Sequence, residues 1–93
     1  MEDVKEDETL LKVKSSSNAP NLASAIANNV YAGKKVVLRA IGAGAVNQAM
    51  KAIAIAQSYV GPRGNILSCR PGFTTVPMPD GEISAMTLRI LVN

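Results

Sequence analysis

Two alanine-rich segments of helical periodicity, each preceded by a strand-like segment, constrain the fold of this chain more than any other feature. Apolar residues recur at helical spacing over 20–31 and again over 45–60. Residues 9–14 alternate between apolar and polar, and residues 35–41 are rich in β-branched side chains, both typical of strands. A strand, a helix and a second strand in this order predict a parallel strand pair joined by a helical crossover.

The rest of the chain predicts two further strands, over 65–70 and 83–92. Three prolines make residues 71–79 either irregular or an edge strand, because proline cannot donate to a central ladder. Pro79-Asp80-Gly81 is typical of a tight turn. The fold class expected is α/β, more closely a two-layer α+β domain of order β-α-β-α-β-β. Right-handed crossovers place both helices on one face of a four-stranded mixed sheet.

Alternation along the predicted strands assigns side chains to the two faces of the sheet. The apolar set expected to face the helices is Leu11, Val13, Val36, Leu38, Leu67, Cys69, Met86, Leu88 and Ile90. The cations expected on the opposite face are Lys12, Lys14, Arg39, Arg70 and Arg89. In the second helix, Val46, Ala49, Met50, Ile53 and Val60 suffice to cover the sheet, and Ile55 falls outside that stripe. A homodimer contact would explain this surplus, and an ordinary thick core is the alternative.

Charge is distributed unevenly around the formal net value of +3. Residues 2–8 carry five acids against one lysine, whereas residues 9–79 carry no acid at all. We therefore expect residues 1–8 to be an acidic, disordered leader and residues 9–93 to form one domain. An acid-free, basic body suits a polyanionic partner, although excess lysine and arginine can also serve solubility alone.

Composition excludes several classes of function. The chain has no histidine and only one cysteine, which excludes a zinc site of cysteine and histidine ligands and an internal disulfide. Cys69 is predicted to face the core without a base beside it, so we expect no enzymatic activity, cofactor, metal or small-molecule substrate. The acidic N-terminus does not resemble a signal peptide, and no stretch is apolar enough to span a membrane. A cytoplasmic location is expected.

Two glycine motifs invite functional interpretations that the flanking residues do not support. Gly42-Ala43-Gly44 lies between a strand and a helix, but a dinucleotide-binding motif needs a third glycine where this chain has Asn47. The G-x-x-G of 61–64 occurs in KH nucleic-acid domains, where it joins two helices. Here it joins a helix to a strand, so a turn is the simpler interpretation.

The segment from Arg39 to Gln57, RAIGAGAVNQAMKAIAIAQ, resembles the stage V sporulation protein S family. The resemblance extends over about 9–92 and includes LKVKSSS, Phe73-Thr74 and Asp80-Gly81-Glu82. That family is similar to Alba, a small dimeric archaeal chromatin protein that binds DNA and RNA, and the resemblance implies an Alba-like fold and a regulatory role in sporulation. Alba-like proteins carry basic residues roughly where this chain has Gly42 and Gly44, and lysine roughly where it has Ser17 and Asn18.

Two functions remain open from the sequence. The first is a nucleic-acid-binding homodimer, for DNA or RNA, that contacts phosphates without strong sequence readout. Its candidate contacts are Lys34, Lys35, Arg39, Lys51, Arg63 and Arg70. The second is a protein-interaction module in sporulation or cell-division regulation. The acid-free, basic body favours nucleic-acid binding. The lack of basic residues at positions 17, 18, 42 and 44 and the scarcity of aromatic residues favour the protein-interaction module.

Overall fold

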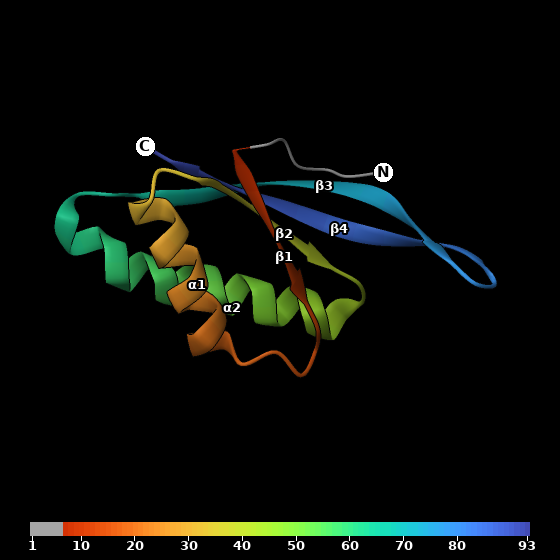
Figure 1. Ribbon diagram of the computed structural model, residues 1–93. Coiled ribbons are helices and arrows are strands. Elements are labelled where there is room, and N and C mark those ends of the chain that lie inside the picture. The colour runs from red at the N-terminus through yellow and green to blue at the C-terminus, as the bar shows by residue number, and fades with distance from the viewer. Residues whose placement is uncertain (1–6) are drawn as a thin grey trace.

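The computed structural model describes residues 7–93, which form two helices on one side of a four-stranded sheet (Figure 1). The elements in chain order are β1 (Glu8–Val13), α1 (Ala19–Tyr31), β2 (Lys35–Ala40), α2 (Ala43–Val60), the short 3-10 helix η1 (Gly61–Arg63), β3 (Leu67–Met78) and β4 (Gly81–Val92). The predicted order β-α-β-α-β-β is confirmed. β1 starts at Glu8, so this residue belongs to the folded part and not to the leader. The disorder predicted for residues 1–6 lies outside the described residues.

The sheet has the strand order β1-β2-β4-β3. β1 and β2 are parallel, as the helical crossover between them predicts, and β4 is antiparallel to both of its neighbours. β3 is therefore an edge strand, whose outer side needs no ladder partner. This position accommodates Pro71 and Pro77 within the strand and resolves the alternatives left open for residues 71–79.

Local signals in the sequence begin and end the helices. The Asn18 side chain accepts a hydrogen bond from the backbone N–H of Asn21 at 2.8 Å, which caps α1. Gly33 follows α1 with φ +76°, and Gly42 precedes α2 with φ +93°, conformations that favour glycine. Gly44 is needed for a different reason, because a Cβ built there would lie 2.8 Å from the Cβ of Ser15. The glycines around α2 thus serve a tight turn and a close approach between chain segments.

The core lies between the sheet and the two helices and contains no aromatic side chain. Its largest fully buried side chains are Ile26, Leu38 and Val36. Fully buried alanines of both helices let the helices approach each other closely, among them Ala23, Ala49, Ala52 and Ala56. Eight of the nine residues expected to face the helices are in this core or pack against it. The exception is Met86, which is 37% exposed.

Three side-chain placements differ from the prediction. Met86 pairs with Ala40, the last residue of β2, so it lies where β4 leaves the part of the sheet that the helices cover. Ile55 was expected outside the covered stripe but is half-buried and packs against the core. Met50, assigned to that stripe, is 45% exposed. Both errors in α2 have one cause: the helix packs against α1 as well as the sheet, so its buried arc is rotated toward α1.

β3 and β4 continue well beyond the rest of the sheet as a two-stranded hairpin (Figure 1). Their pairing runs from Leu67 opposite Val92 to Met78 opposite Gly81. β2 pairs with β4 only over residues 86–89 of β4. We call residues 73–86 the hairpin arm. It presents four exposed large apolar side chains, those of Phe73, Met78, Ile83 and Met86.

Candidate nucleic-acid interface

The face of the sheet that points away from the helices, here called the open face, carries the predicted cluster of cations. Residues that alternate with the core-facing positions of each strand lie on it. β1 contributes Lys12, β2 contributes Lys35 and Arg39, β3 contributes Arg70 and β4 contributes Arg89. The expectation that every strand presents a cation on this face is confirmed. Lys14, which was also expected there, lies in the loop after β1.

The strand register places like charges side by side on the open face. Lys12 is the register partner of Arg39 across the parallel β1–β2 pair. Arg70 is directly opposite Arg89 across the antiparallel β3–β4 pair. Like charges opposite each other on neighbouring strands destabilise a sheet. Two such pairs concentrate positive charge on one face of the sheet.

One acid lies among these cations. The Glu8 carboxylate forms an ion pair and hydrogen bond with the Arg89 guanidinium. The Glu8 side chain is only 4% exposed, and that of Arg89 is 34% exposed. Reasoning from sequence missed Glu8 because its charge matched the acidic leader. The alternation of β1 could have identified it, since residues 8, 10 and 12 share one face.

The six candidate contacts do not lie on a single surface. Lys35, Arg39 and Arg70 belong to the open face, whereas Lys51 is exposed on α2 and Lys34 lies in the turn before β2. Arg63 ends η1, so Lys34, Lys51 and Arg63 are separate cations and not an extension of the open face.

Arg63 follows α2 and has an interaction of its own. Its guanidinium carbon is 4.5 Å from the centroid of the Tyr31 ring, a cation–π contact. The Tyr31 hydroxyl in turn donates a hydrogen bond to the Tyr59 carbonyl at 2.8 Å. These contacts tie the ends of the two helices together and give Arg63 a structural role.

The loop after β1 and the turn that leads into α2 meet in space. Ser15 packs against Gly44, and the Gln48 side chain donates a hydrogen bond to the Ser17 carbonyl at 2.8 Å. Residues 15–18 and 42–44 contain no cation. The surface they form together is therefore neutral, and the positive charge of this chain is concentrated elsewhere.

Within residues 7–93, no group of three or more histidine, cysteine, aspartate or glutamate side chains is arranged to hold a metal ion. No helix in the same range has the length and apolarity needed to cross a membrane. Cys69 is half-buried and packs against the core, on the face predicted for it.

Comparison with known proteins agrees with the fold. The sequence model of the family described as stage V sporulation protein S matches residues 9–93. Among solved structures, the chain is similar to Alba from Thermoplasma volcanium, with a TM-score of 0.61 and 15% sequence identity. That match covers 91% of this chain and 99% of the other. The fold is Alba-like, and at this identity the likeness to Alba concerns the fold alone.

Proposed function

The chain belongs to the stage V sporulation protein S family, and from this membership we propose that it is a small cytoplasmic regulatory protein that binds nucleic acid as a homodimer. In this proposal it contacts phosphates without strong sequence readout. The Alba-like fold supports the proposal, because Alba itself is a dimeric protein that binds DNA and RNA. The open face, with cations from all four strands, is the surface we assign to binding.

The like-charged pairs of the open face carry this assignment. The side chains of the Lys12–Arg39 pair repel each other, and the Glu8–Arg89 ion pair only lessens the repulsion between Arg70 and Arg89, so a polyanion laid across the sheet would stabilise both pairs. Phosphate binding of this kind releases counterions and depends strongly on salt. Among the described residues, Phe73 is the one aromatic residue that lines a pocket together with Arg70 and Arg89, so the platform of several stacking aromatic side chains that single-strand and RNA-binding sheets use is not part of the proposal.

A salt-dependent titration tests the proposal. Labelled duplex and single-stranded oligonucleotides of unrelated sequence are titrated with the protein by fluorescence anisotropy at about 50 and about 200 mM salt. We expect similar affinities for unrelated sequences and a steep decrease in affinity at the higher salt. Arg39→Ala and Arg70→Ala should each weaken binding and reduce the salt slope by about one unit for each phosphate that is no longer neutralised.

Lys51→Ala provides the matched control, since it removes one positive charge from the helix layer. If Lys51→Ala weakened binding as much as Arg39→Ala, the interface would not be confined to the open face, and the cations of the helix layer would again be candidate contacts. Absence of binding to either form of nucleic acid at about 50 mM salt would contradict the proposed function itself.

The hairpin arm supports a second candidate function, a protein-interaction module. Phe73 is 77% exposed and Met78 is 49% exposed, on a two-stranded element that neither helix covers. Exposed aromatic and methionine side chains are typical of protein interfaces. Under this alternative, Phe73→Ser abolishes the regulatory effect in cells while Arg39→Ala preserves it. The nucleic-acid proposal predicts that Arg39→Ala abolishes this effect.

A further inference from the structure

The sheet divides into two halves at one end, and a cavity lies in the fork between them. β1 and β2 remain paired as far as Glu8 and Lys35, and β3 and β4 remain paired as far as Leu67 and Val92. The register between β2 and β4, in contrast, stops at Val37 opposite Arg89. The cavity, here called the fork cavity, has a volume of about 720 Å³. This size is within the range of small-molecule sites in proteins.

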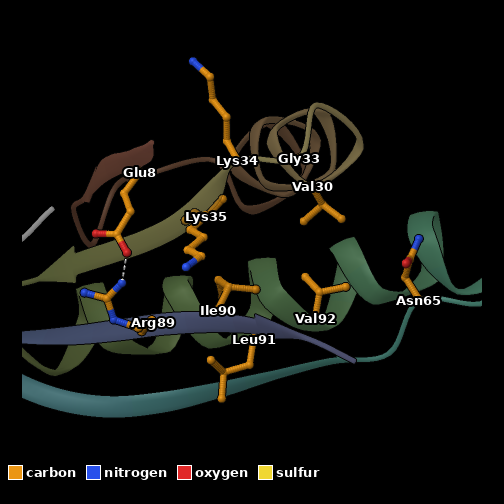
Figure 2. Close-up of a pocket in the computed structure, with 11 residues that line it drawn as sticks. Glu8, Val30, Gly33, Lys34, Lys35, Asn65, Arg89, Ile90, Leu91 and Val92 are labelled. Atoms are coloured by element: carbon orange, nitrogen blue, oxygen red, sulfur yellow. Dashed lines mark hydrogen bonds and ion pairs between the residues drawn. The ribbon is translucent and has the colours of Figure 1, made fainter. Parts of the chain in front are cut away.

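Aliphatic side chains line much of the fork cavity. Val30 of α1 reaches it from above, and Ile90 and Val92 of β4 line it from below (Figure 2). Val92 is 43% exposed, which leaves apolar surface open to solvent at this place. No aromatic side chain is among the lining residues that the structure describes. The cavity therefore suits an aliphatic group better than a nucleobase, which proteins bind by stacking.

Basic side chains outnumber acidic ones among the described residues that line the fork cavity, and the two lysines among them point in different directions. The Lys35 ammonium points into the space between β2 and β4, whereas the neighbouring Lys34 points away from it (Figure 2). Glu8 is the one acid among the described lining residues, and its carboxylate pairs with Arg89. The charge of Lys35 is thus directed into the cavity beside an aliphatic surface. An anionic group is the complement of this arrangement.

We propose that the fork cavity binds a small amphipathic anion, an aliphatic chain that carries one carboxylate or phosphate group. The anionic group is held by the Lys35 ammonium, and the aliphatic chain lies along Val30, Ile90 and Val92. This site shares Lys35 with the open face, but its aliphatic lining of Val30, Ile90 and Val92 is not part of that surface. It involves no chemical step and stands whether or not the protein binds nucleic acid.

Octanoate and octyl phosphate are suitable probes, because they share one aliphatic chain and differ in the anionic group. Each is titrated into the isotopically labelled, full-length protein without nucleic acid, and binding is followed by amide chemical shifts. We expect saturable shifts at the fork, at Lys35, Ile90 and Val92, and not in the hairpin arm. Octylamine and octanol, with the same chain and no negative charge, should bind at least about tenfold more weakly.

Lys35→Met and Lys34→Met form a matched pair of variants. Each removes one exposed positive charge and keeps a long side chain, but only Lys35 points into the cavity. Lys35→Met should weaken octanoate binding by about tenfold, and Lys34→Met should leave it unchanged. Val92→Asp places a repelling carboxylate at a half-exposed position and should also abolish binding. The amide spectrum of each variant shows directly whether it is folded.

Three results would overturn the proposal. The first is that neither octanoate nor octyl phosphate causes saturable amide chemical-shift changes at the fork. The second is equal binding of octanoate and octylamine. The third is equal weakening by Lys34→Met and Lys35→Met, which would mean that overall charge and not the cavity attracts the anion. Tighter binding of octanoate or octyl phosphate than of octanol supports the site. The tighter-binding anion of the two shows whether the site prefers a carboxylate or a phosphate.

Discussion

The ion pair between Glu8 and Arg89 joins β1 to β4 over the intervening strand β2 on the open face of the sheet. It places a nearly buried carboxylate among the cations of this face and beside the guanidinium that Arg70 opposes. Glu8 therefore lessens the repulsion between the two arginines. It also lowers the positive charge available to a polyanion. The same contact thus has opposite consequences for stability and for binding.

Removing the charge of Glu8 should separate these two consequences. Glu8→Gln keeps the shape of the side chain but removes the charge that pairs with Arg89. We expect a decrease of about 1–2 kcal/mol in the free energy of unfolding, since the Glu8 side chain is buried but Arg89 is partly screened by solvent. Nucleic-acid binding should become tighter, because the open face gains net positive charge. Urea unfolding and anisotropy measure the two effects.

Asp80→Asn is the control for Glu8→Gln. It removes one negative charge at an exposed turn of the hairpin arm, far along the chain from the ion pair. Its unfolding free energy should change by less than about 0.5 kcal/mol. Equal stability of Glu8→Gln and wild type would contradict the structural role given to the ion pair.

Gly44→Ala should destabilise the protein although alanine is the better helix former. Gly44 lies in the first turn of α2, and an added Cβ would lie 2.8 Å from the Cβ of Ser15. Overpacking of this kind costs about 1–3 kcal/mol. Combining Gly44→Ala with Ser15→Gly removes the opposing Cβ and should restore most of the stability in thermal unfolding. Failure of the second substitution to rescue the first would place the cause in the backbone and not in the contact.

Much of the fold could be predicted from the sequence, because its signals are local. Asn18, Gly33 and Gly42 mark helix ends through backbone conformation and capping, which depend on a few neighbouring residues. The apolar alternation of the strands likewise identified most of the core. Met50 and Ile55 were misplaced because their exposure depends on how α2 rotates against α1. That rotation is a property of packing and not of either helix alone.

The candidate sites could be predicted less well, because they depend on register. Alternation indicated that Arg70 and Arg89 share a face, but only the strand pairing places them opposite each other. A small-molecule site was not expected from any residue pattern either. The fork cavity exists because the β2–β4 ladder stops at Val37 and Arg89, and no sequence motif marks that point.

The proposed homodimer should depend on α2. Met50 is 45% exposed on this helix, so Met50→Glu should not disturb the core. We expect wild type to be dimeric by light scattering at tens of micromolar, an order of magnitude usual for dimers, and Met50→Glu to be monomeric. Ser24→Glu, the same charge change on the exposed side of α1, should remain dimeric. Ile55→Glu is unsuitable as a probe, because Ile55 packs against the core and its replacement would destabilise the subunit.

The acidic leader should weaken polyanion binding by competing for the cations of the body. Residues 2–6 contain three acids and one lysine, followed by Asp7 and Glu8. Deletion of residues 2–6 spares Glu8 and the hydrogen bond that the Lys35 backbone N–H donates to the Asp7 carbonyl at 3.3 Å. We expect tighter binding of the truncated protein at about 50 mM salt and a smaller difference at about 200 mM, because salt screens the competition.

Substitution of the leader acids by their amides gives the control for this deletion. Glu2→Gln, Asp3→Asn and Glu6→Gln together remove the charge at constant length. If charge is the cause, this triple variant should tighten binding as much as the truncation does. Unchanged affinity in both variants at about 50 mM salt would show that the leader does not compete with nucleic acid.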